Sequence, residues 1–208
     1  MGGGGKTEQL AGKRIATVVG AGSHYYLDTW LLFHGVDPKS VKIFNLQPEQ
    51  MEAALYKGEV DAVAIWEPHP YNLVNALVGA KVMDNPGTYV LNFNLIAHKK
   101  LMGKRDADLV KLLRALARAE RFIKAEPRKA QAILRARLQL DQTYIDWIWQ
   151  HNVYQLNLDQ SLLSTLESEA RWARQESHVT ENTVVNYLDF IYVEPMLKVD
   201  PKAVGIKK

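Results

Sequence analysis

Three short apolar runs near the start of the chain alternate with two segments in which apolar residues recur at helical spacing. The runs are Arg14–Val19, Val41–Leu46 and Asp61–Trp66. The first is rich in β-branched residues and carries no charge after Arg14, which is typical of a strand covered on both faces. The pattern predicts a βαβαβ unit over residues 12–68. In such parallel sheets small ligands bind beyond the carboxyl ends of the strands.

From residue 97 onward the pattern becomes helical. One long helix is expected with Asp106 as its N-cap and an apolar face made of Leu109, Leu112, Leu113, Leu116 and Ile123. Further helices are expected from Pro127, around Tyr144–Ile148 and after the predicted N-cap Asp159. In the first part, helices are expected from Ser23, from Pro48 and beyond Pro68, and Tyr89–Ile96 is expected to be extended. The chain is thus predicted to be α/β first and helical afterwards.

Composition narrows the function classes only slightly. The chain has 208 residues, no cysteine and a formal net charge of +3, which is too small to indicate a nucleic-acid partner. No apolar stretch approaches the ~18 residues of a membrane span, and residues 1–9 are interpreted as a tag or disordered start. The charge is unevenly distributed. Residues 8–92 contain six Lys or Arg against nine Asp or Glu, whereas residues 93–208 contain nineteen Lys or Arg against fourteen Asp or Glu, so the second part is the basic one. Arg114, Arg118 and Arg121 form either a binding stripe or, as we favour, a solvated helix face.

Polar and aromatic side chains follow all three predicted strands: Gly20-Ala21-Gly22-Ser23-His24, Asn45-Leu46-Gln47 and Trp66-Glu67-Pro68-His69. Two glycines and a serine at the start of a helix present free backbone N–H groups, which suit an anionic oxygen. An ordinary strand–helix turn capped by Ser23 explains the same residues equally well. Trp66 is interpreted as a pocket wall rather than a core residue because it stands at a strand end.

Other chemical motifs fail on spacing. Gly5-Lys6-Thr7 lacks the earlier glycine and the strand of a P-loop. A dinucleotide fingerprint starting at Gly20 would need its third glycine at Tyr25. Glu67 and His69 lack a third ligand for a metal, and Ser23 with His24 lacks an identifiable acid for a hydrolase. We therefore predict no metal, no cofactor and no catalytic residue, with His24 and Tyr25 exposed unless they line the pocket.

Three stretches together resemble one family: LAGKRIATVVGAGSHYYLDTWLLFHGV, VKIFNLQPEQMEAALYKGEVDAVAIWEPHPYNLV and YLDFIYVEPMLKVDPKAVGI. They are similar to the solute-binding proteins of nitrate/sulfonate/taurine (NitT/TauT) ABC importers and their thiamine-precursor-binding relatives. The resemblance implies a periplasmic-binding-protein-like type II fold that traps a ligand between two lobes. Residues 10–88 would form one complete doubly wound lobe, 89–96 the hinge crossing, and 97–208 the mainly helical C-terminal part of the other lobe.

The resemblance also implies which residues bind. Gly22, Ser23 and His24 match the contacts for an anionic head group, Trp66 and Glu67 match a strand-end wall, and Asn45 and Gln47 are weaker matches. The implied protein is not an enzyme; it passes a small anion to a membrane permease and is periplasmic or extracytoplasmic, free or anchored as a lipoprotein. The alternatives are a pyrimidine-precursor synthase that uses pyridoxal phosphate, and a ligand-sensing module of a signalling protein.

The family pattern includes an N-terminal part that this sequence does not contain. We therefore expect the apolar faces around Leu112, Leu116 and Trp147 to lack the sheet that covers them. Either the chain is a piece of a longer protein or it completes itself by self-association.

Overall fold

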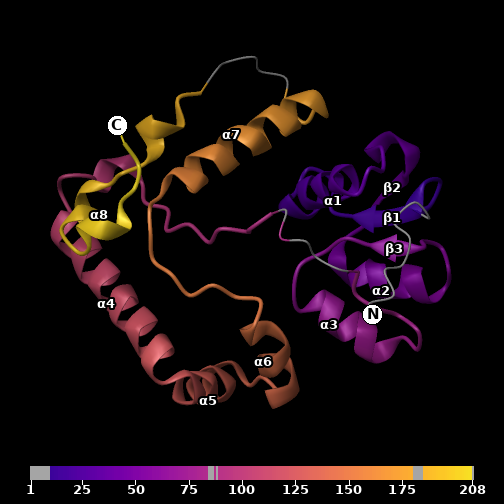
Figure 1. Cartoon of the computed structure of the whole chain (residues 1–208), viewed down its shortest axis with the longest axis horizontal. Coiled ribbons are helices and arrows are strands. Elements are labelled where there is room, and N and C mark those ends of the chain that lie inside the picture. Colours follow the sequence, from indigo (N-terminus) through magenta and orange to yellow (C-terminus); the bar gives the residue numbers. More distant parts are fainter. Residues whose placement is uncertain (1–9, 84–86, 88, 180–184, 208) are drawn as a thin grey trace. The chain divides into compact units, whose positions relative to one another are not determined.

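The computed structural model describes residues 10–83, 87, 89–179 and 185–207. The chain divides into two compact units, Met1–Asn92 and Phe93–Lys208 (Figure 1). The division falls within the range 89–96 that the sequence analysis assigns to a crossing. Whether that range acts as a hinge stays a prediction, and the interpretation of residues 1–9 lies outside the described residues.

A parallel three-stranded sheet forms the centre of the first unit. It consists of β1 (Arg14–Thr17), β2 (Lys42–Asn45) and β3 (Ala62–Val63), in the order β2-β1-β3 (Figure 1). In the register, Ile15 lies opposite Ile43 on one side and Ala62 on the other. The three predicted strands are confirmed, each shorter than its apolar run.

Three helices accompany the sheet: α1 (Gly22–Phe33), α2 (Pro48–Tyr56) and α3 (His69–Ala76). Alternate residues of β1 belong to two separate cores, since neighbouring side chains in a strand point to opposite faces. Ile15 packs with Leu31 and Trp30 of α1, whereas Ala16 packs with Met51 of α2. The sheet is therefore covered by α1 on one face and by α2 on the other, as a doubly wound unit requires.

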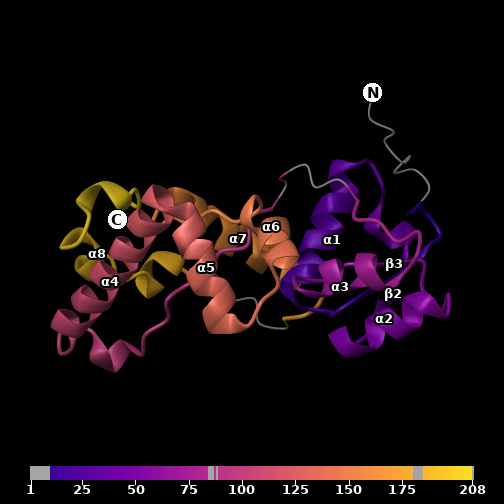
Figure 2. The ribbon, with the colours of Figure 1, turned by 90° about the horizontal axis from the view of Figure 1, so that it is seen from below.

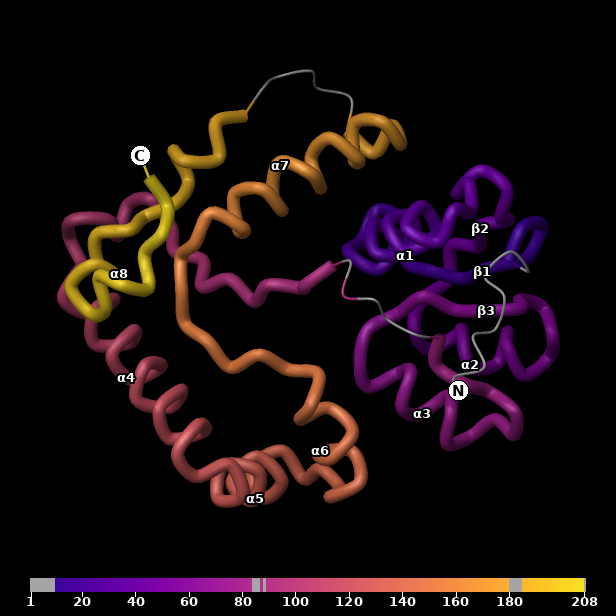
Figure 3. The backbone as a smooth tube through the Cα atoms, viewed as in Figure 1, coloured from indigo at the N-terminus to yellow at the C-terminus, as the bar shows by residue number. Residues whose placement is uncertain are grey.

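The second unit is helical, as predicted, and Figures 2 and 3 trace its course. Its helices are α4 (Asp106–Ala125), α5 (Pro127–Leu138), α6 (Gln142–Trp149), α7 (Gln160–Gln175) and α8 (Glu194–Leu197). Short 3-10 turns lie at Pro38–Ser40 in the first unit and at Lys99–Leu101, Tyr187–Phe190 and Pro201–Ala203 in the second. No helix among the described residues combines the length and the apolarity needed to cross a membrane.

Two predicted helix starts of this unit are confirmed, and one is wrong. Pro127 begins α5, and the Asp159 carboxylate accepts a hydrogen bond from the Ser161 N–H at 2.9 Å at the start of α7. Asp106 is not the cap of α4, because Arg105 holds that position. The Asp106 carboxylate instead accepts from the Tyr192 hydroxyl at 2.8 and 2.9 Å, which ties α4 to the C-terminal segment.

Part of the apolar face of α4 is open to solvent. Leu112 is 43% exposed and Leu116 is 39% exposed. The buried cluster of this unit lies elsewhere, around Ile191, Val193 and Ile206. The expectation that the α4 face is uncovered is therefore confirmed for these two leucines, while Trp147 is only half-exposed.

An ion pair joins the first strand to the third. Both the backbone N–H and the guanidinium of Arg14 donate to the Asp61 carboxylate, each with a contact of 2.8 Å. These hydrogen bonds favour the ionised acid, and they hold the pKa of Asp61 well below its usual range. Because Asp61 precedes β3, the pair fixes the position at which β3 meets β1.

This pair predicts a specific acid sensitivity. A carboxylate with a lowered folded-state pKa adds stability above the unfolded-state pKa of about 3.9, and this stability is lost as the pH falls further. The unfolding free energy of the native chain should therefore exceed that of Asp61→Asn by a constant amount above about pH 5. The difference should narrow below about pH 4 in urea unfolding. Glu59→Gln is the charge-matched control, because Glu59 is exposed and lies 3.9 Å from Lys57; a profile equal to that of Asp61→Asn would contradict the assignment.

Candidate functional site

The carboxyl ends of the three strands meet at one edge of the first unit. The Ala64 N–H donates to the Ala16 carbonyl at 2.8 Å, and the Leu46 N–H donates to the Thr17 carbonyl at 3.2 Å. The segments after β2 and β3 therefore begin beside the end of β1. The sheet thus assembles the three stretches that the sequence analysis singled out.

The first turn of α1 presents two free backbone donors. Ala21 is the N-cap, with φ −91° and ψ 172°. The N–H groups of His24 and Tyr25 donate to the Ala21 carbonyl at 3.0 and 3.2 Å. Among the described residues, the N–H groups of Gly22 and Ser23 have no acceptor. These two N–H groups stand at the end of the helix with the positive partial charge, and the anion contact predicted for Gly22, Ser23 and His24 stays a prediction.

Ser23 does not cap the helix, contrary to one of the two interpretations of the turn. Its hydroxyl accepts a hydrogen bond from the Thr17 hydroxyl at 2.9 Å, and both side chains are buried. No side chain caps α1. Ser23 instead joins the end of β1 to the start of α1, which holds its own N–H in place.

His24 is buried rather than exposed. Its Nδ1 accepts from the Gly20 N–H at 3.3 Å, and its Nε2 lies 3.9 Å from a carboxylate oxygen of Asp28, which is also buried. No acid partner was predicted for His24, although Asp28 lies one helical turn away. Gly20 has φ 81°, a conformation that favours glycine. His24 therefore positions the glycine turn.

Asn45 and Gln47 are engaged at the end of β2. The Asn45 side-chain oxygen accepts from the Val19 N–H at 3.1 Å and so links β2 to the loop after β1. Gln47 is the N-cap of α2, and its N–H donates to the Gln50 side chain at 3.0 Å. Both residues are exposed. Their local roles are to hold the loop and to start a helix.

Trp66 and Glu67 follow β3. Trp66 is 43% exposed, so it is not a core residue, and its indole is accessible as a wall. The Glu67 carboxylate accepts from the Tyr71 N–H at 3.4 Å in the first turn of α3. The Glu67–Pro68 peptide bond is cis. No group of three or more metal-ligating side chains is found within the part of the chain that the structure describes.

A segment that was not predicted as part of the site covers the start of α1. The Tyr89 ring packs edge-on against Tyr25, with centroids 5.3 Å apart, and also contacts Tyr26. A Cβ added to Gly22 would lie 3.7 Å from the Tyr89 hydroxyl and 3.9 Å from Leu91. The aromatic pair Tyr25-Tyr26 at a helix start was the available signal. The space into which a side chain at Gly22 would point is thus bordered by Tyr89 and Leu91.

Comparison with known proteins gives the family. The model of the NMT1-like family matches residues 4–138, which is more than half of the chain. The chain belongs to the NMT1-like family. A further relative is the taurine-binding periplasmic protein of Escherichia coli (strain K12), 42% identical over 72 residues that make up 35% of this chain and 21% of that protein.

Two solved structures share the fold of this NMT1-like chain. The periplasmic aliphatic sulphonate binding protein SsuA from Escherichia coli superposes with a TM-score of 0.73 at 20% identity, covering 90% of this chain and 61% of SsuA. The alkanesulfonate-binding protein SsuA from Xanthomonas axonopodis pv. citri, bound to MOPS, gives 0.60 at 20% identity, with coverages of 86% and 63%. The chain thus spans less than two thirds of these relatives.

These findings confirm the resemblance to the NitT/TauT-type solute-binding proteins and the periplasmic-binding-protein fold. They concern the family and the fold and do not test the roles of single residues. The seven candidate ligand-binding residues remain predictions, with the local roles described above.

Proposed function

We propose that this chain is the solute-binding component of an ABC importer and binds a small anion with a sulfonate-type head group. The observation that carries the proposal is the pair of N–H groups on Gly22 and Ser23, which have no acceptor among the described residues and stand at the start of α1. A relative named for taurine, a sulfonate, supports the choice of head group. The proteins compared above are binding proteins, and none is described as a synthase or a sensor.

Binding in this proposal uses a rigid donor pair. Two oxygens of the head group accept from Gly22 and Ser23, and the helix end adds roughly half a positive charge. Two hydrogen bonds hold the turn in place before the anion binds. The Gly20 N–H donates to the His24 ring, and the Val19 N–H donates to the Asn45 side chain. The exposed indole of Trp66 supplies an apolar wall for the rest of the solute. His24, Glu67, Asn45 and Gln47 support the site rather than contact the anion.

The proposed protein performs no chemistry. It works outside the cytoplasmic membrane, in the periplasm, free or anchored by a lipid, and it delivers the solute to a membrane permease. Nucleic acid has no part in this function.

Isothermal titration calorimetry of the full chain with taurine tests the proposal. We expect saturable 1:1 binding of taurine or of methanesulfonate, because both carry the same head group. Nitrate, sulfate and a pyrimidine thiamine precursor complete the panel. Binding of the pyrimidine alone, or of none of these compounds at millimolar concentration, would reject a sulfonate-binding function for this chain.

A further inference from the structure

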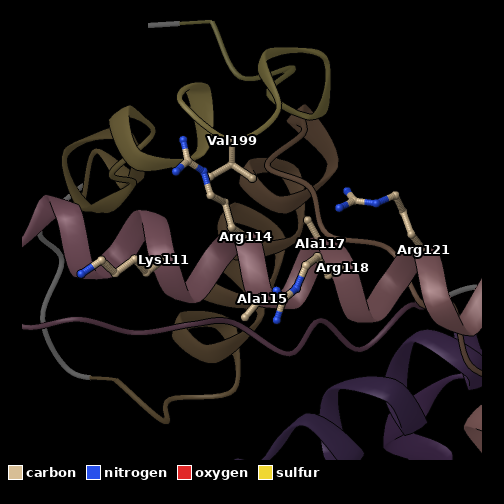
Figure 4. A pocket seen from close by; sticks show the side chains of 7 residues that line it. All are labelled: Lys111, Arg114, Ala115, Ala117, Arg118, Arg121 and Val199. Carbon is tan, nitrogen blue, oxygen red and sulfur yellow. The ribbon is translucent and has the colours of Figure 1, made fainter.

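The long helix of the second unit carries four exposed cations in a row. Lys111, Arg114, Arg118 and Arg121 line an open groove of about 460 Å³ together with Ala115, Ala117 and Val199 (Figure 4). At 1.5 Å per residue the row extends about 15 Å along α4. The guanidinium of Arg114 reaches toward Val199, and the four side chains are spread along the helix (Figure 4). We call these four residues the basic row.

The basic row carries more positive charge than the acids beside it balance. Within the described residues none of its four members forms an ion pair. The nearest acids on the helix are Asp108 and Glu120. They form ion pairs with Arg105 and Lys124 and also attract Lys111 and Arg121 at longer range. The second unit is basic overall, with nineteen Lys or Arg against fourteen Asp or Glu over residues 93–208. The groove therefore presents a net positive charge.

The row also stays accessible if the open apolar face is covered. At 100° per residue the four cations fall within an arc of about 80° around α4. Leu112 and Leu116 lie roughly 140–180° away from the middle of this arc. A partner that packs on these leucines would thus leave the row in solvent. The leucine face and the basic row of α4 can therefore bind different partners.

The geometry points to a surface of anions as the occupant. The cations are too far apart for one small anion to contact all four. The rest of the groove is alanine and valine, which offer no hydrogen bonds for recognising a defined shape. Lipid phosphates can move to match the spacing of the cations, so a lipid surface needs no complementary shape. We propose that the basic row of α4 binds the phosphate head groups of an anionic lipid bilayer.

This proposal goes beyond the proposed function, because it involves the second unit alone and needs no solute. The test is sedimentation of the full chain with phosphatidylglycerol/phosphatidylcholine vesicles at low salt. Arg114→Gln/Arg118→Gln is compared with Arg137→Gln/Arg171→Gln, which removes the same charge from α5 and α7. Each cation near an anionic bilayer contributes about fivefold in partitioning, so we expect a loss of roughly 30-fold for the first pair. The second pair should bind within about threefold of the native chain.

We expect no binding to pure phosphatidylcholine and release in about 0.5 M salt, because exposed charges are screened. Equal losses in the two double variants, or no loss in Arg114→Gln/Arg118→Gln, would overturn the assignment to the row. Failure to bind anionic vesicles at low salt would also overturn it. If millimolar inorganic phosphate displaces the chain from the vesicles, the row is a small-anion site instead. If the chain binds immobilised polyglutamate but not vesicles, the partner of the row is an acidic polypeptide. Titration of the same variants with taurine tests the proposed function separately, because taurine binding in that proposal does not involve the basic row.

Discussion

Gly22→Pro is expected to weaken taurine binding by about 10- to 150-fold while the fold is retained. Proline is well accommodated at the first position of a helix, where Gly22 lies, and it needs an extended residue before it. Ala21 has that conformation, with ψ 172°. The substitution therefore removes one of the two free N–H groups and places the ring Cδ where its hydrogen pointed, while the start of the helix is kept. A hydrogen bond to a charged group contributes roughly 1.5–3 kcal/mol, which gives the expected range.

Gly22→Ala is the matched control for this change. Its new Cβ would make ordinary contacts at 3.7 and 3.9 Å with Tyr89 and Leu91, and it keeps the N–H. Calorimetry should give an affinity within about threefold of the native value. If the alanine variant loses as much affinity as the proline variant, space at Gly22 matters and its N–H does not. Unchanged affinity in Gly22→Pro would remove the N–H from the binding site.

Leu31→Ala should destabilise the first unit by about 3–5 kcal/mol. Leu31 is fully buried in the core between α1 and the sheet, where it packs with Ile15 and Trp30. Leucine-to-alanine changes at such sites lose both the transfer free energy and the contacts around the cavity left behind. Urea unfolding followed by circular dichroism measures this cost. This loss of unfolding free energy is a large fraction of the stability of a domain of this size.

The neighbouring leucine is the control. Leu32 is 63% exposed in the same turn of α1, so Leu32→Ala changes helix composition equally without opening a cavity. Its cost should stay below about 0.5 kcal/mol. Similar costs for the two variants would show that helix propensity, rather than the core at Leu31, decides their effect.

The strands and helices were predictable because their signals are local. The uncharged run after Arg14 and the proline starts at Pro48 and Pro127 have direct structural counterparts. Helix caps were less predictable where a distant partner competes. Asp106 looked like a cap, but its carboxylate binds the hydroxyl of Tyr192, which is 86 residues away in sequence. Such a long-range contact leaves no local pattern in the sequence.

At the candidate site, sequence located the loops and misjudged the directions of side chains. The glycine turn after β1 was recognised as a cluster of N–H donors, and two of these donors are free. Ser23 was expected at the helix cap, yet its hydroxyl turns to Thr17, because a buried hydroxyl requires a partner. The buried neighbour of His24, Asp28, was present at i+4 spacing and could have been found. Which residues contact a solute depends on the ligand and stays a prediction.

The central position of β1 makes the first unit cooperative. Within the described sheet, β2 and β3 each pair with β1, and neither pairs with the other. Neither outer strand keeps its backbone partners unless the middle strand is in place. The Gly22 turn leaves directly from this middle strand, so the site exists only when the whole sheet is folded. If the proposed solute binds there, its binding is thermodynamically linked to all three strands, and its binding free energy adds to the stability of the entire unit rather than to one loop.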